Sequence, residues 1–165
     1  MKTRELSMIG LLSIVLSISG AFKLPGIIPG TEFQLSAPIA IGISVCFGFK
    51  RYFLAGLVSS LISLLLGTHT VINVAISIIF RVVAGGLIHI LGTSAIVVIL
   101  AGPIGTIIAR IVLGILIGKG VVPLIIAAMP GMLYTSVFSW PVSKLILKVK
   151  ALTSWRNIEN GEKTF

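Results

Sequence analysis

Long apolar segments fill most of this chain, and two arginines, Arg81 and Arg110, lie deep within them. No aspartate or glutamate occurs inside those segments. With 56% hydrophobic residues, 10% charged residues and a mean hydropathy of +1.17, the composition is that of an integral membrane protein rather than a soluble domain. The chain is therefore expected to fold within a lipid bilayer.

Six apolar stretches predict six transmembrane helices, with five or seven as alternative counts. A helix needs about 20 mainly apolar residues to cross the hydrocarbon, and the second and third stretches are short enough to thin the bilayer or to be re-entrant. Unbroken apolar runs such as Ile111–Ile117 exclude a β-barrel, whose strands alternate apolar and polar residues. We predict an all-α, polytopic membrane protein, in which residues 1–150 form a compact bundle of six transmembrane helices and residues 151–165 form a short cytoplasmic tail. The predicted spans are Leu6–Phe22, Leu35–Phe49, Phe53–Gly67, Thr70–Leu91, Ser94–Gly118 and Val121–Leu147.

Basic residues set the orientation, because those in short loops stay on the cytoplasmic side. With the amino terminus inside, nine of the 13 Lys and Arg residues fall on cytoplasmic segments, two (Lys23 and Lys119) fall outside, and the other two are Arg81 and Arg110. We predict a multi-pass protein of the cell membrane with both termini in the cytoplasm. The net charge of +9 is divided among membrane flanks, so it does not indicate nucleic-acid binding. The nine are Lys2, Arg4, Lys50, Arg51, Lys144, Lys148, Lys150, Arg156 and Lys163.

The fourth predicted span carries a polar stripe that ends at an arginine. Thr70, Asn73, Ser77 and Arg81 follow one another at spacings of three and four, which places them on one helical face. Arg81 then lies roughly 16 Å from the outer end of its helix, and Arg110 roughly 12 Å from the outer end of the fifth. The two arginines are expected at similar depths.

Burying such a cation has a large cost unless something compensates it. The cost is about 2.5–3.5 kcal/mol for each arginine near the bilayer centre, and such residues normally face the bundle interior or a wet cavity. Because no buried acid is present, we expect the compensating negative charge to come from a ligand with a carboxylate or phosphate. A neutral ligand is the alternative. The alternative is that each guanidinium caps backbone carbonyls, extends to the interface or stacks on Tyr134 or Phe80.

Further polar and small residues fall where they would complete such a site. Thr106 precedes Arg110 by one turn, and Pro130 predicts a kink near Tyr134 in the sixth span. Glu32 and Gln34 lie in the first outer loop, which we expect either to cover the pocket or to be a solvated turn. Ser13, Ser17 and Ala21 form a row of small residues that predicts close helix contact, within the bundle or with a partner.

The residues that are absent exclude several mechanisms. Ion-coupled carriers place Asp, Glu or His in the membrane to bind the coupling ion, and no acid lies at those depths. Relative to Gly118-Lys119, Leu113 stands where the first glycine of a phosphate-binding loop would be and Gly120 stands in place of its Ser/Thr, so we expect no ATP-driven motor in the chain. His69 and His89 are too far apart to share a metal. We therefore expect no enzymatic activity, no metal and no cofactor.

A compact, basic, six-span protein with both ends inside, a polar outer-half site and no energy source resembles the substrate-binding S component of energy-coupling factor (ECF) vitamin transporters. The likeness covers about residues 6–147. In that family an Ala-x-x-x-Ala motif in the first helix docks on the transmembrane coupling subunit, and the matching register here is Ser13, Ser17 and Ala21, with serine in place of alanine. Two segments, Ser60–Thr68 followed by Asn73 and Trp140–Leu145, look like members assigned to thiamin precursors.

The resemblance implies a pocket near the outer surface, built from the fourth to sixth helices and capped by the first loop. A vitamin or vitamin precursor would be captured there, and the bundle would tilt when a coupling subunit and two cytoplasmic ATPases act. The competing hypothesis is a small anion-selective channel or facilitator lined by the two arginines. The expected ligand-binding residues are Arg81, Arg110, Asn73, Ser77, Thr106, Tyr134, Glu32 and Gln34.

Overall fold

The computed structural model describes residues 3–25, 32–34, 36–118 and 120–159, and within them the chain folds into six helices. Four helices are long and apolar enough to cross a membrane, while α2 and α3 are shorter. The predicted all-α membrane fold is confirmed, with one addition: two three-residue strands pair antiparallel between α1 and α2. The elements are α1 (Thr3–Ala21), β1 (Lys23–Pro25), β2 (Glu32–Gln34), α2 (Ser36–Phe47), α3 (Phe49–Leu65), α4 (Val71–Leu91), α5 (Ala95–Ile117) and α6 (Val121–Glu159).

Local sequence explains where the helices begin and end. Thr70 caps α4, because its hydroxyl accepts a hydrogen bond from the backbone N–H of Asn73 at 3.3 Å. Gly48 separates α2 from α3 with a φ of 82°, and Gly92 ends α4 with a φ of 87°. These positive φ values favour glycine, which has no Cβ to clash. Each turn therefore forms where the sequence supplies the residue that fits it.

Small residues allow the helices to approach closely. Gly102 on α5 lies against Thr135 on α6, where any added Cβ would collide with the threonine methyl. Gly105 on α5 lies against Phe80 and Ala84 on α4. Contacts of this kind are typical of membrane helices, whose association depends on close packing. They fix the registers in which α5 runs antiparallel to α4 and to α6.

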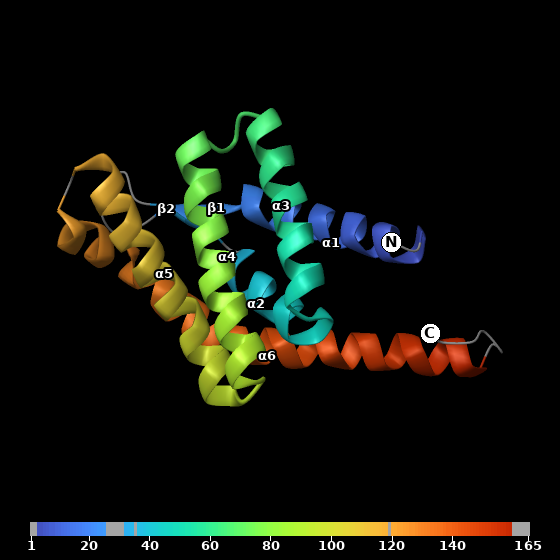
Figure 1. Cartoon of the computed structure of the whole chain (residues 1–165). Coiled ribbons are helices and arrows are strands. Elements are labelled where there is room, and N and C mark those ends of the chain that lie inside the picture. The colour runs from blue at the N-terminus through green and yellow to red at the C-terminus, as the bar shows by residue number, and fades with distance from the viewer. Residues whose placement is uncertain (1–2, 26–31, 35, 119, 160–165) are drawn as a thin grey trace.

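The short helix α2 lies at the centre of the molecule (Figure 1). Ile43 belongs to a buried cluster with residues of α1 and α3, whereas Ile41 belongs to a second cluster with residues of α4 and α5. Many large apolar side chains stay exposed on the long helices, for example Leu133 and Val137 of α6, each 66% exposed. In a membrane protein such residues face lipid.

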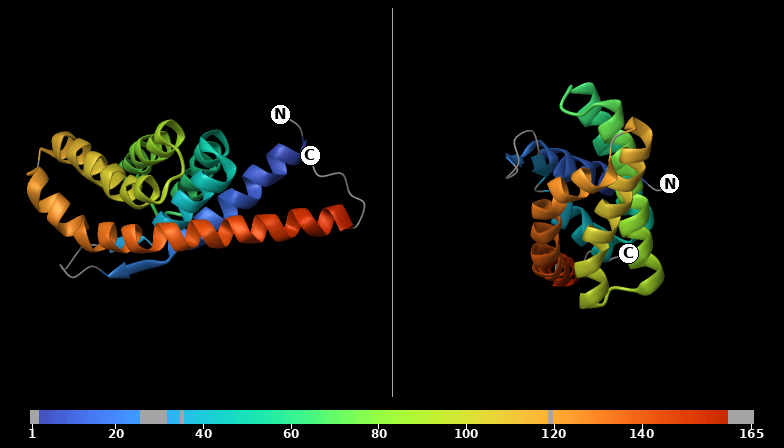
Figure 2. Two further views of the ribbon diagram at one scale, coloured as in Figure 1. Left: turned by 90° about the horizontal axis from the view of Figure 1, so that it is seen from below. Right: turned by 90° about the vertical axis from the view of Figure 1, so that its left-hand side faces the viewer.

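Contacts between distant segments place the charged ends of several helices together. Glu5 of α1 pairs with Arg51 of α3 at 3.5 Å, and Lys150 Nζ of α6 donates to the carbonyl oxygen of Cys46 at 2.7 Å. The start of α1 and the end of α6 lie toward the same end of the molecule (Figure 2). This agrees with two termini on one side of the membrane, while the cytoplasmic assignment of that side stays a prediction.

Helix α6 is longer than the sequence predicted. It continues beyond Leu147 to Glu159, through the first nine residues of the segment that we interpreted as a tail, 151–159. The last residues of that segment, 160–165, lie outside the described part of the chain.

Candidate functional site

Arg81 lies at the contact between α4 and α3 and is held by two serine hydroxyls. Its Nη1 atom donates to Ser60 Oγ at 2.7 Å and to Ser77 Oγ at 2.8 Å, and the two hydroxyls are 3.0 Å apart. Ser77 also donates to the carbonyl oxygen of Val74 at 2.8 Å, so Ser60 is left as the donor between the serines. The two N–H groups of Nη1 and both serine hydroxyls are therefore hydrogen-bonded, but every partner of the cation is neutral.

Gly56 on α3 provides the space for the Arg81 side chain. An added Cβ at Gly56 would collide with Nε and Cδ of the arginine. Arg81 is therefore directed toward α3, whereas the sequence led us to expect a site among the fourth to sixth helices. Ser77 and Arg81 from the polar stripe of α4 meet Gly56 and Ser60 of α3 along one line of contact, which we call the α3–α4 seam (Gly56, Ser60, Ser77 and Arg81).

Hydrogen-bonding capacity remains unused beside this seam. Nη1 carries two of the five N–H donors of Arg81, and no described residue accepts from the other three, on Nε and Nη2. Tyr52 is fully buried, its ring lies against Gly85, and its hydroxyl has no hydrogen-bond partner among the described residues. Tyr52 precedes Gly56, the residue against which Arg81 packs, by one turn of α3. The seam thus joins a cation to unfilled polar groups, which is the chemistry of an anion site.

Arg110 lies apart from the seam hydroxyls. Because Gly105 lies beside Phe80 and Ala84, the antiparallel register places Arg110 near the level of Ser77 and Thr106 near the level of Arg81. The predicted similarity in depth of the two arginines agrees with this register. Arg110 is partly buried, and no ion pair or side-chain hydrogen bond joins it to another described residue.

The remaining predicted ligand contacts are dispersed. The Asn73 residue is exposed, and the Tyr134 ring packs at a tilt against Phe138 with ring centroids 4.9 Å apart. The contact of Gly102 with Thr135 places Tyr134 about seven residues, or roughly 10 Å, from the level of Arg110. Glu32 and Gln34 are in β2, but their side chains lie outside the described residues.

The small-residue row of α1 points into the bundle for most of its length. Ser13 is buried, with its hydroxyl bonded to the carbonyl of Ile9, and Ser17 donates to Ser59 of α3 at 3.0 Å. Ala21 is exposed. Internal packing, the alternative that the sequence left open, accounts for Ser13 and Ser17, while docking on a coupling subunit stays a prediction.

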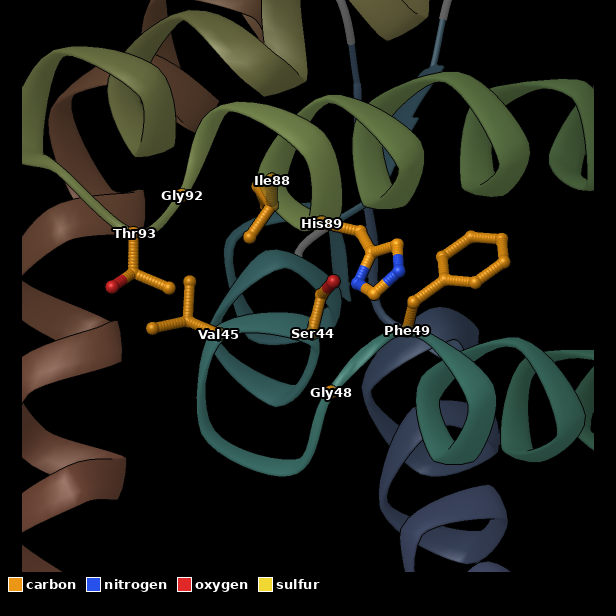
Figure 3. Close-up of a pocket in the computed structure, with 8 residues that line it drawn as sticks. All are labelled: Ser44, Val45, Gly48, Phe49, Ile88, His89, Gly92 and Thr93. Carbon is orange, nitrogen blue, oxygen red and sulfur yellow. The ribbon is translucent and has the colours of Figure 1, made fainter.

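A cavity that the sequence did not indicate lies at the far end of α4 from Thr70. Its volume is about 260 Å³, and it is bounded by the two glycine turns, at Gly48 and Gly92 (Figure 3). The signals that the sequence offers for this cavity are Gly48, Gly92 and His89. They could not be combined in advance, because the two glycines are 44 residues apart in sequence and meet only through packing. The lining residues are Ser44, Val45, Gly48, Phe49, Ile88, His89, Gly92 and Thr93.

Comparison with known proteins gives one strong relationship. No protein-family model matches the chain. It is 50% identical over 147 residues to Protein BioX of Lysinibacillus sphaericus, an alignment that covers 89% of each chain. The likeness to thiamin-precursor members finds no support in this comparison.

Proposed function

The chain belongs to the family of Protein BioX, and from this premise we propose that it is the membrane-embedded substrate-capture subunit of an ECF-type ABC importer. It binds a small vitamin or vitamin precursor from the outer side of the cell membrane. A transmembrane coupling subunit and two cytoplasmic ATPases then deliver the ligand inward by tilting the bundle. The protein binds its ligand without changing it chemically.

The ligand of the proposal is biotin or an anionic precursor of it. The printed name of the relative, Protein BioX, favours biotin over other vitamins. Biotin carries a carboxylate, and a guanidinium holds a carboxylate with two parallel N–H···O bonds. The unused N–H groups of Arg81 suit that arrangement.

The proposal rests on one observation: the hydrogen-bond partners of Arg81 are all uncharged. Ser60 and Ser77 satisfy Nη1 but bring no negative charge. A charge inside the membrane is normally paired or faces a wet pathway, and it is a functional site by default. A bound carboxylate would supply the missing charge at the α3–α4 seam. We assign the unpaired Tyr52 hydroxyl to it as a second donor.

The test is equilibrium binding of radiolabelled biotin to the full chain in nanodiscs without ATPases. Two ligands are compared, biotin and biotinamide, which keeps the rings and the chain but lacks the charge. We expect Arg81→Gln to weaken biotin binding at least tenfold, since hydrogen bonds to charged groups are each worth about 1.5–3 kcal/mol. Biotinamide should bind weakly to both proteins.

Arg51→Gln is the matched control, because Arg51 is paired with Glu5 and is 40% exposed at the basic end of the molecule. It should leave biotin affinity within about twofold, as expected of an exposed pair. Equal affinity of wild type and Arg81→Gln would refute the assignment of the site. Anion conduction by the purified protein alone would favour the channel.

A further inference from the structure

The cavity at the far end of α4 is lined by both polar and apolar side chains. Val45, Ile88 and Phe49 provide apolar surface, while Ser44, His89 and Thr93 provide hydrogen-bonding groups. The Phe49 and His89 rings stack with centroids 6.0 Å apart, which positions the imidazole. With about 260 Å³, the cavity has room for several waters or for a small organic molecule.

The hydroxyl of Ser44 is the second observation that indicates a ligand. Ser44 is only 3% exposed, and its Oγ has no hydrogen-bond partner among the described residues. Figure 3 shows this hydroxyl beside the His89 ring. Buried hydroxyls are nearly always paired, because leaving one unpaired costs about 1–3 kcal/mol. A molecule in the cavity would satisfy it.

The charged residues around the cavity determine whether a bound molecule is favoured as a cation or as an anion. Lys50 and Arg51 follow Phe49 directly in the chain, and the ammonium of Lys150 is bonded to the carbonyl of Cys46, two residues from Ser44. Glu5 is the one described acid contacting these bases, and it is already paired with Arg51. The local field therefore disfavours a cation and favours an anion.

We infer that this cavity is a second binding site, which takes a short aliphatic carboxylate. The alkyl body lies against Val45, Ile88 and Phe49, and the carboxylate accepts from the Ser44 hydroxyl and from an imidazole N–H of His89. The site is two turns of α4 beyond Arg81, so it is separate from the α3–α4 seam. Under the predicted orientation it faces the cytoplasm.

The test uses hexanoate and 1-hexanol, which share an alkyl chain and differ in charge, with the full chain in nanodiscs of zwitterionic phosphatidylcholine. These nanodiscs contain no anionic headgroup that would compete for the site. Binding is measured by ligand-observed NMR. We expect saturable hexanoate binding that Ser44→Ala weakens about tenfold or more, as expected for loss of a hydrogen bond to a charged group. His89→Leu should have a comparable effect, and hexanol should bind at least tenfold more weakly.

Ser139→Ala is the matched control, because Ser139 is equally buried but is bonded within its own helix and does not line the cavity. It should leave hexanoate binding unchanged. Arg81→Gln should also leave it unchanged, so loss of biotin binding with retention of hexanoate binding separates this site from the proposed transport site. Equal binding of hexanol, or hexanoate binding that survives both Ser44→Ala and His89→Leu, would overturn the inference.

Discussion

Arg81 on α4 donates to the hydroxyl of Ser60 on α3 at 2.7 Å, so the buried cation also links two neighbouring helices. Ser77 on the same helix as Arg81 completes the arrangement at 2.8 Å. The bond between helices fixes where the guanidinium points, and a fixed guanidinium is preorganised for a ligand. Fold and proposed binding site therefore depend on the same contact.

Ser60→Ala should reduce both stability and ligand affinity. It removes one acceptor from a buried cation, and the loss is expected to be about 1.5–3 kcal/mol in the free energy of unfolding. Thermal unfolding of the detergent-solubilised protein measures the change. Ser7→Ala is the control, because Ser7 is exposed and bonds only within α1. Equal melting temperatures for the two variants would show that the Ser60 contact contributes nothing.

Gly56→Ala should displace the Arg81 side chain. The added methyl group occupies the position of Nε and Cδ, so the arginine must leave the seam or the helices must separate. We expect a loss of biotin binding of at least tenfold and a lower melting temperature. Gly86→Ala is a matched glycine control on α4 with nothing within 4 Å of the added Cβ. It should stabilise by about 0.5–1 kcal/mol, because alanine favours a helix.

A double variant tests whether Gly56→Ala acts by displacing the Arg81 side chain. In an Arg81→Ala background the space beside Gly56 is open, so a further Gly56→Ala change should have little additional effect on melting temperature. Additive losses in the double variant would mean that the glycine acts through another neighbour.

The sequence predicted the helices well because their boundaries depend on local chemistry. Gly48, Gly92 and Gly118 fall where the chain turns, and each has a positive φ. The polar stripe on α4 was also visible, since its members are three or four residues apart. The end of α6 was missed because the segment after Leu147 is polar, yet no glycine or proline interrupts it before Gly161.

The direction of Arg81 could not be predicted, because it depends on which helix packs against the stripe. The sequence contains both halves of the seam, Gly56 and Ser60 on one helix and Ser77 and Arg81 on another. No local sequence pattern in either helix indicates that these two faces pack against each other. The cavity beside Ser44 was hidden for the same reason, since Gly48 and Gly92 meet only through tertiary packing.

Tyr52→Phe should stabilise the unliganded protein. The Tyr52 hydroxyl is buried without a partner, and removing an unsatisfied polar group while keeping the ring avoids a penalty of about 1–3 kcal/mol. We expect a higher melting temperature without ligand and weaker biotin binding, because the proposal gives this hydroxyl to the carboxylate. A lower melting temperature would mean that the hydroxyl is paired in the membrane. Unchanged affinity would remove Tyr52 from the site.

Two changes in α1 separate its internal role from the proposed docking role. Ser13 is 1% exposed, so Ser13→Leu must force apart packed helices, and we expect the isolated protein to lose about 1–3 kcal/mol of stability. Ala21 is exposed, so Ala21→Leu should leave the melting temperature and biotin affinity of the isolated protein unchanged. In the proposed importer the same leucine should hinder close approach of a coupling subunit. Co-purification with that subunit measures this effect, and full assembly of Ala21→Leu would place the docking surface elsewhere on the molecule.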